Sequence, residues 1–233
     1  MHRFFVSQKI NNSFVLDSDL LHHLKVARLF DDEFLLNYHN EFYRCRYNKD
    51  TNQADIIAKV ELNHEYQSDL VLAAPVIKGE RFEWMIEKAV ELGVKTIIPM
   101  LSQFSNRKYL EINFKNEKKY VRYRTKIKEA AQQSFRNIIP QITQVQSFRE
   151  LITQYLDKNY NIYIAHEQLD SKHQINSIQT NSLIIVGPEG GLSKDEIVWS
   201  IALNNDKIHF ISLGKRILRA ETAAISMLAL VKE

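Results

Sequence analysis

The spacing of apolar residues along the chain changes near residue 70. Before that point, short β-branched and aromatic runs alternate with turns rich in Asn and Asp, a pattern typical of antiparallel strands. One helical stretch, residues 17–30, interrupts these runs, and Asp17 or Ser18 is placed to cap its first amides. The pattern predicts a small antiparallel barrel or sandwich at the N-terminus.

From residue 70 onward, continuous apolar runs alternate with segments of helical period, which is typical of a parallel sheet covered by helices. The first helical segment ends at Gly93, where a left-handed cap residue is wanted. We therefore expect an α/β chain of two domains, residues 1–69 and 70–233. Further expected elements are strands at 69–77, 95–100, 141–145 and 161–166, a basic helix at about 114–135 and a helix at 148–156.

Two glycine-bearing segments near the C-terminus are the most informative part of the sequence. VGPEGGLS (186–193) and SLGKRILRAETAAI (212–225) each follow a short apolar strand and lead into a helical pattern. Two such units in tandem place both loops at the carboxyl edge of one parallel sheet, where open α/β folds bind ligands. Neither loop matches GxGxxG or GxxxxGK[ST], which argues against a Rossmann dinucleotide site and a P-loop.

The first loop combines close backbone approach with a strong helix start. Gly187, Gly190 and Gly191 let the main chain reach a ligand that a β-carbon would block. Ser193 is placed to cap a helix that begins at Lys194, and a Glu three residues after the Ser completes a capping box. The alternative is a tight turn that binds nothing.

The second loop is apolar and basic at once. Leu213, Ile217 and Leu218 beside exposed main-chain groups suit an adenine-like ring. The alternative role for Arg219 and Glu221 is an ion pair at the start of the following helix.

Composition narrows the class of protein. Apolar residues make up 45% of the 233, and Cys45 is the only cysteine, which excludes an internal disulfide and a cysteine-cluster zinc site. We expect a cytoplasmic protein, because neither a signal peptide nor a membrane span is visible in the sequence. We also expect that His22 and His23 do not bind a metal ion. The net charge is +3, but eight Lys or Arg fall between residues 115 and 136, either a phosphate-attracting stripe or a solvated helix face.

Polar residues close this basic helix. Gln133, Ser134, Arg136 and Asn137 suit contact with phosphates and base edges, and Arg107 with its neighbour Lys108 would join them; the alternative is ordinary polar loop ends.

These segments occur together, in order, over nearly the whole chain, and the set resembles the bacterial 16S ribosomal RNA uridine-N3 methyltransferase family, which belongs to the knotted SPOUT methyltransferases. The segments that carry the resemblance are RFFV, HHLKVARL, GERFEWMIEKAVELGVKTIIPMLSQFSNRK, EAAQQSFRNIIPQI, IIVGPEGGLSKDEI and LGKRILRAETAAI.

The resemblance implies a C-terminal SPOUT domain threaded into a trefoil knot, a rare exception to the rule against threading, and a PUA-like β-barrel at the N-terminus. It also implies S-adenosylmethionine bound in the knotted loops. Dimerisation through the knot helices would use a small apolar face at residues 223–228 (Ala223, Ala224, Met227 and Leu228). The implied cofactor residues are His166, Gly187, Pro188, Glu189, Gly190, Leu213, Gly214, Ile217, Leu218 and Arg219.

The resemblance further implies that the chain methylates N3 of a uridine in 16S rRNA or the small ribosomal subunit. Because N3 must lose its proton, we expect Arg219 and Arg136 to donate to the charge on O2 and O4, with the second subunit as an alternative source of Arg136. Glu221 is a candidate proton acceptor, with water or an RNA group as alternatives. The implied RNA-binding residues are Arg3, Arg28, Arg107, Lys108, Gln133 and Arg136.

Three positions depart from the family pattern: Phe135 replaces a usual Gly, and Lys215 and Ala220 replace a common Pro and Thr. Two other functions stay open, a ribose 2′-O-methyltransferase of the same superfamily acting on transfer or ribosomal RNA and a non-catalytic RNA-binding protein.

Overall fold

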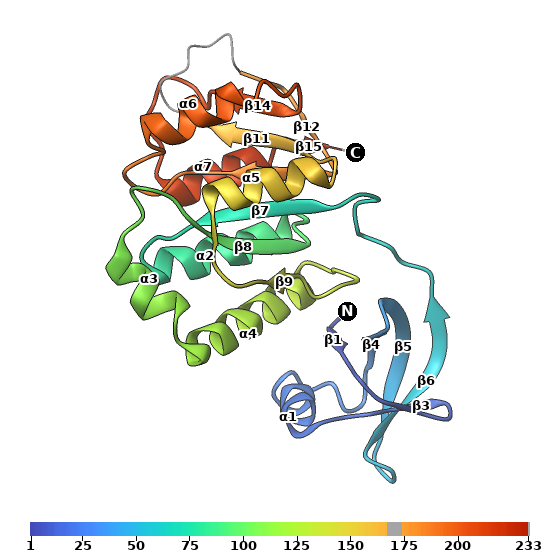
Figure 1. The fold of residues 1–233 in the computed structure, drawn as a ribbon. Helices are drawn as coiled ribbons and strands as arrows, with labels where there is room; N and C mark the ends of the chain where they lie inside the picture. Colours follow the sequence, from blue (N-terminus) through green and yellow to red (C-terminus); the bar gives the residue numbers. More distant parts are fainter. Residues whose placement is uncertain (167–173, 233) are drawn as a thin grey trace. The chain divides into compact units, whose positions relative to one another are not determined.

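The computed structural model describes residues 1–166 and 174–232. Within it the chain forms two compact units (Figure 1). The first consists of Met1–Glu65 together with Ala131–Ile138, and the second of Tyr66–Ala130 with Ile139–Glu233. The first unit therefore takes eight residues from the middle of the chain.

The first unit is built on a six-stranded sheet, which confirms the expected mostly antiparallel strands at the N-terminus. Its strands follow the order β1-β4-β5-β6-β3-β2, and every pair is antiparallel except β1 with β4. The strands are β1 (Arg3–Phe5), β2 (Lys9–Ile10), β3 (Ser13–Val15), β4 (Glu33–Tyr38), β5 (Glu41–Asn48) and β6 (Gln53–Val60).

Helix α1 (Ser18–Val26) covers the core of this sheet. Asp17 caps it, because its side chain accepts a hydrogen bond from the Leu20 amide at 2.8 Å. Leu20 and Leu24 are the buried residues of the helix, and they pack with Phe14 and Phe34 of the sheet. One apolar face on a short helix is thus enough to close this small core.

The inserted segment, residues 131–138, is anchored to the first unit by its side chains. Phe135 has a left-handed φ of 64°, and its ring lies 5.1 Å from that of Phe42, with the Arg3 guanidinium carbon 4.3 Å from its centroid. The Asn137 side chain donates to the carbonyls of Asn40 and Leu62 at 3.0 and 2.7 Å. Phe135, which stands where the family usually has Gly, is therefore held in the left-handed conformation that favours Gly by its contacts with an aromatic ring and a guanidinium group.

The second unit contains a seven-stranded sheet in which every pair is parallel, as the apolar runs predicted. Its order is β10-β8-β7-β13-β11-β14, with β9 pairing to β8. The strands are β7 (Leu70–Pro75), β8 (Thr96–Leu101), β9 (Gln141–Ile142), β10 (Gln146–Ser147), β11 (Asn161–Ala165), β13 (Ser182–Ile185) and β14 (Ile208–Ile211).

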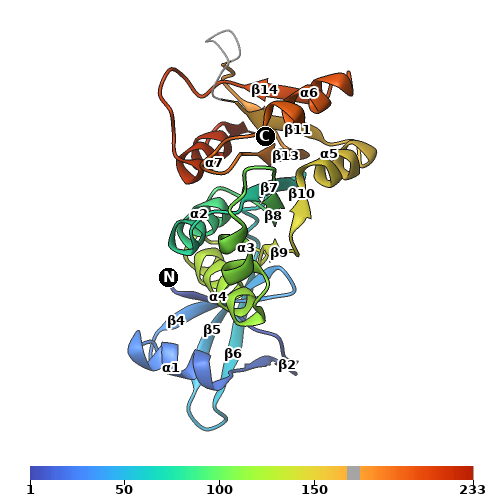
Figure 2. The same ribbon diagram turned by 60° about the vertical axis from the view of Figure 1, so that its left-hand side comes forward.

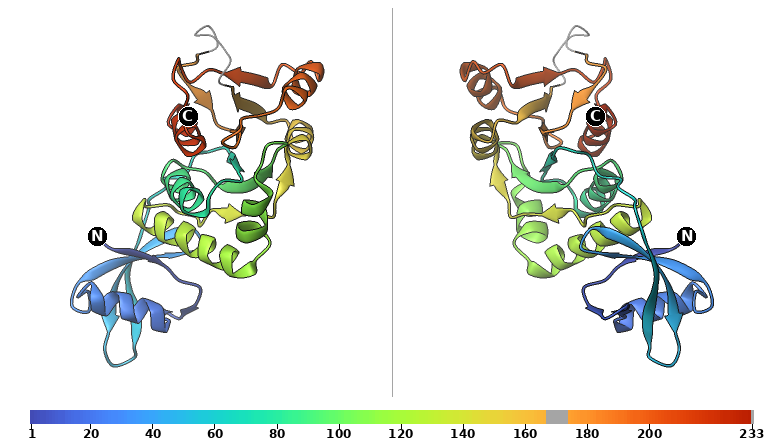
Figure 3. Two further views of the ribbon diagram at one scale, coloured as in Figure 1. Left: turned by 90° about the vertical axis from the view of Figure 1, so that its left-hand side faces the viewer. Right: turned by 90° about the vertical axis from the view of Figure 1, so that its right-hand side faces the viewer.

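Helices cover both faces of this sheet (Figures 2 and 3). Helices α2 and α7 pack against each other on one face of the sheet, and α5 lies on the other face. The Trp199 ring of α6 lies beside Phe148 of α5. The helices are α2 (Gly79–Glu91), α3 (Arg107–Phe114), α4 (Glu117–Gln133), α5 (Phe148–Asp157), α6 (Lys194–Ala202) and α7 (Ala220–Leu228).

The small apolar residues of α7 occupy a different place from the predicted one. Ala223, Ala224, Met227 and Leu228 are all buried within their own chain, because α7 packs on α2, β7 and β13. The expectation that these four side chains form a dimer face is therefore wrong. Their small size serves close approach of the helix to its own sheet.

Other boundaries follow local chemistry. Gly93 has a φ of 90° and ends the first helical segment, as expected. The expected basic helix begins at Glu117, and the separate α3 before it starts where Asn106 caps the Lys108 amide. A two-stranded pair, β12 (Ile178–Gln179) with β15 (Val231–Lys232), was not expected. In the described part of the chain, no helix is both long enough and apolar enough to cross a membrane.

Candidate functional site

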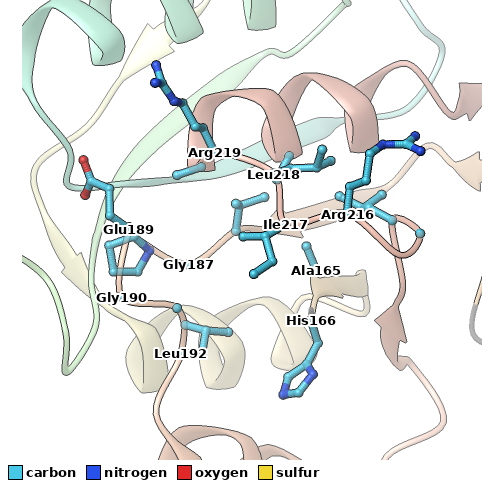
Figure 4. A pocket seen from close by; sticks show the side chains of 17 residues that line it. Ala165, His166, Gly187, Glu189, Gly190, Leu192, Arg216, Ile217, Leu218 and Arg219 are labelled. Carbon is cyan, nitrogen blue, oxygen red and sulfur yellow. The ribbon is translucent and has the colours of Figure 1, made fainter. Parts of the chain in front are cut away.

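Three chain segments converge at the carboxyl ends of β13, β11 and β14, which are neighbours in the sheet. They are the loop 186–193 after β13, the end of β11 at Ala165 and His166, and the loop 212–219 after β14 (Figure 4). The expectation that both glycine loops lie at one edge of a parallel sheet is confirmed.

The first loop is tightly folded on itself. A β-carbon on Gly187 would lie 2.9 Å from the backbone carbon of Gly191, closer than real β-carbons approach. The Gly191 amide donates to the Pro188 carbonyl at 2.8 Å, which closes the turn. Gly187 is thus required for the shape of the loop.

A capping box fixes the far end of this loop, as predicted. The Ser193 hydroxyl accepts from the Glu196 amide at 3.1 Å, and the Glu196 carboxylate accepts from the Ser193 amide at 2.8 Å. The second carboxylate oxygen of Glu196 accepts from the Gln103 amide, in the loop after β8, at 2.9 Å. The cap therefore connects the glycine loop to a neighbouring loop of the same sheet edge.

The second loop presents apolar side chains without a regular element. Gly214 has a φ of 100°, and Ile217 is 89% exposed. Helix α7 begins at Ala220, so Arg219 is its N-cap residue, yet the Arg219 side chain makes no capping bond. An exposed Ile at a loop tip beside a cavity is typical of a ligand contact.

The three segments enclose a cavity of about 420 Å³, within the range of small-molecule sites. Figure 4 shows Ile217 and Leu218 between Gly187 on one side and Arg216 on the other, whereas the His166 ring points away from Arg219. All ten residues expected to hold a cofactor line it. The structure adds Ala165, Val186, Gly191, Leu192, Arg216, Ala220 and Ala223 to that lining.

Arg81 of α2, to which the sequence pattern assigns no role, contacts the lining of the cavity. Its guanidinium lies 3.7 Å from Glu189 in the first loop and 3.7 Å from Glu221 in α7. Glu221 is only 7% exposed, and its Oε2 makes no hydrogen bond to the described residues. Helical periodicity marks Arg81 only as a polar position, so nothing in the sequence pattern indicated this contact.

Arg136 is not among the residues that line this cavity. It is 3% exposed within the first unit, where it forms a two-pronged ion pair with Glu65 at 2.6 to 3.0 Å. Burial by itself would raise the pKa of Glu65. The Arg136 charge and the amides of Asn137 and Ile138 outweigh that effect and hold the Glu65 pKa below its usual value.

The residues expected to bind RNA have varied surroundings. Arg3 donates to the main-chain carbonyls of Gln132 and Gln133, which places it against the inserted segment. Arg28 is exposed just after α1, and the Gln133 side chain is exposed at the end of α4. Arg107 and Lys108 are exposed in the first turn of α3.

The basic helix is partly neutralised. Arg122 and Lys126 of α4 pair with Glu83 and Glu87 of α2 at 2.6 and 3.0 Å, and Arg124 pairs with Glu117. Two of the eight basic residues of the stripe thus form a contact between helices α4 and α2. Among the described residues no cluster of His, Cys, Asp or Glu is able to hold a metal ion, and His22 and His23 are exposed.

The parallel α/β unit with its loop-lined cavity is that of an RNA methyltransferase, since residues 64–232 match the RNA methyltransferase domain family. More particularly, the chain belongs to the ribosomal RNA small subunit methyltransferase E family. It is 39% identical to that enzyme of Mesomycoplasma hyopneumoniae over 98% of this chain and 97% of the relative. It is 28% identical to the Bacillus subtilis enzyme, over 99% and 96%.

Two solved structures resemble this chain over nearly its full length. The Neisseria gonorrhoeae ribosomal RNA small subunit methyltransferase E, bound to S-adenosyl methionine, has the same fold, with a TM-score of 0.79 and 24% identity over 98% of this chain and 95% of that one. A Legionella pneumophila protein in complex with the bound cofactor SAM has a TM-score of 0.76 and 25% identity, over 97% and 95%.

Proposed function

We propose that this chain methylates N3 of a uridine in the 16S rRNA of the small ribosomal subunit, with S-adenosylmethionine as methyl donor. The observation that carries the proposal is the convergence of all ten expected cofactor residues on one cavity, in a chain that matches methyltransferase E relatives over almost its full length. An rRNA substrate also agrees with the expected cytoplasmic location.

The cavity suits the cofactor in size and chemistry. Gly187 and Gly190 contribute main chain to its lining, and Leu213, Ile217 and Leu218 supply apolar surface for an adenine ring. When bound, S-adenosylmethionine supplies an electrophilic methyl group on a positively charged sulfur. The cofactor-binding role of these loop residues rests on this fit and on the resemblance stated above.

The chain's own residues would align the uracil and manage its proton. Arg219, free of any capping bond, is suited to donate to O2 or O4 as negative charge develops there. Glu221 Oε2, which has no hydrogen-bond donor in the described part of the chain, is suited to accept the N3 proton. Because Glu65 already holds Arg136, we assign the donor role to Arg219 rather than to Arg136.

Three further features belong to this proposal: threading of the C-terminal domain into a knot, closure of the N-terminal sheet into a PUA-like barrel, and a homodimer through the C-terminal helices. The parallel pairing of β15 with β12 and the return of α7 to β7 after the edge strand β14 support a threaded path. A dimer would use the exposed surface at the end of α7, where its C-cap residue Ala229 lies, since Ala223 and Ala224 within the helix are buried.

Nucleoside analysis after labelling tests the reaction. The purified protein and labelled S-adenosylmethionine are added to small ribosomal subunits from cells that lack this protein. We expect the label to appear in N3-methyluridine. Label in a 2′-O-methyl nucleoside would overturn the assignment of N3 as the methylated atom. Failure to label subunits, free rRNA or transfer RNA, with no cofactor binding by calorimetry, would leave a non-catalytic RNA-binding protein.

A further inference from the structure

A second cavity, of about 320 Å³, lies next to the cofactor-sized one. It is formed by the first two turns of α2 and the start of α7, and Arg219 lines both cavities, so they share a wall. The lining residues are Glu80, Arg81, Trp84, Arg219, Glu221 and Thr222.

The chemistry of its walls is unusual for a plain surface hollow. Trp84 is 46% exposed, and it lines the cavity together with two arginines, Arg81 and Arg219. Glu221 is more than nine-tenths buried, and its Oε2 has no hydrogen-bond partner among the described residues. A buried carboxylate oxygen without a donor is costly, which indicates that a ligand supplies one.

We propose that this second cavity is the subsite for the target base, a uracil turned out of the RNA stack. The inference rests on the proposed methyl transfer to N3. Enzymes that modify a base extrude it, stack it on aromatic side chains and read its Watson–Crick edge. Uracil presents one N–H donor between two carbonyl oxygens on that edge. The cavity offers groups of the complementary kinds, a Glu221 carboxylate oxygen without a hydrogen-bond donor among the described residues and two arginines.

Each lining residue then has a defined task. The Trp84 ring stacks on the base, Arg81 and Arg219 donate to O2 and O4, and the Glu221 carboxylate accepts the N3 proton. The N3 electron pair forms the bond to the methyl carbon as the carbon–sulfur bond breaks, with its electron pair staying on sulfur. The proton from N3 ends on Glu221, so charge and atoms balance.

Arg81 also connects the two cavities. It lies 3.7 Å from both Glu189 of the cofactor loop and Glu221 of the base subsite. A base that draws the guanidinium toward its carbonyl oxygen alters this shared contact, so we infer that base and cofactor binding influence each other.

Fluorescence gives a test that does not require turnover. The chain has two tryptophans, so the Trp199→Phe variant leaves Trp84 as the only indole. We expect decameric oligouridine, added with S-adenosylhomocysteine, to quench this emission at lower concentration than oligocytidine does. Equal quenching by both oligonucleotides, or none with either, would overturn the assignment of the subsite to uracil.

Kinetics give the second test. We expect Trp84→Ala to raise the KM for RNA about tenfold or more, given the usual contribution of base stacking, and to leave cofactor affinity by calorimetry unchanged. Trp84→Phe should largely restore the KM. Glu221→Gln should lower kcat about a hundredfold with a small change in KM.

Arg149→Gln, an exposed position of α5, is the control and should behave like the wild type. An unchanged KM in Trp84→Ala would overturn the proposal, as would a Trp84→Ala variant that changes only its oligomeric state. A wild-type protein that produces no N3-methyluridine would instead refute the proposed function, while the fluorescence titration still reports on the base site.

Discussion

Glu65 and Arg136 form the most deeply buried ion pair of the first unit, with side chains 9% and 3% exposed. Removing one partner of such a pair leaves an uncompensated charge, which typically costs about 3–5 kcal/mol, whereas an exposed pair contributes at most about 1 kcal/mol. We therefore expect Glu65→Gln to lower the free energy of unfolding by about 3 kcal/mol in urea titrations. Asp31→Asn, which breaks the exposed pair with Lys49, should change it by less than about 1 kcal/mol.

The same pair predicts a direction for the pH dependence. Folding lowers the pKa of Glu65, so its contribution to stability is present above the unfolded value of 4.5 and is lost as pH falls through the folded pKa. The difference in unfolding free energy between wild type and Glu65→Gln should shrink in acid. A difference that stays constant from pH 7 to pH 3 would show that the pair does not act through its charge.

At the scale of the elements, two helices begin with the same capping box, but only one of them borders the cavity. Ser193 starts α6 directly after the glycine loop 186–193 that lines the cavity, and Ser147 starts α5 away from the cavity lining. Ser-to-Ala changes at such caps cost about 1 kcal/mol. We expect Ser193→Ala and Ser147→Ala to lower thermal stability similarly, but only Ser193→Ala to weaken S-adenosylmethionine binding in calorimetry. Equal cofactor affinity in both variants would show that the cap does not order the loop.

The capping boxes, the parallel sheet and the glycine loops were all predictable, because each has a local sequence signature. The Arg81 contacts with Glu189 and Glu221 were not predictable, since they join residues more than a hundred positions apart that periodicity treats as separate polar sites. The prediction that the small apolar residues of α7 form a dimer face is wrong for a related reason. A small apolar helix face has the same pattern whether its partner is a second copy or its own sheet.

At the scale of the whole molecule, the first unit depends on eight residues from the middle of the chain. The sequence pattern predicts a single boundary near residue 70, because an inserted segment that is fixed by side chains has no period of its own. The segment 131–138 supplies Arg136 to Glu65, the Phe135 ring to Phe42, and the Asn137 amide to two carbonyls. Without this segment, the Glu65 carboxylate would lose its ion-pair partner and the Phe42 ring would lose the aromatic ring that packs on it.

A fragment of residues 1–65 should therefore fail to unfold cooperatively, although it contains every strand of its sheet. Fusing residues 131–138 to its C-terminus through a Gly/Ser linker should restore a cooperative urea transition, because the linked segment reaches its site at high effective concentration. The same fusion carrying Arg136→Ala and Asn137→Ala is the matched control and should not restore it. A fragment 1–65 that folds as stably as the fusion would show that the inserted segment is dispensable. Far-ultraviolet circular dichroism of the three fragments separates these outcomes.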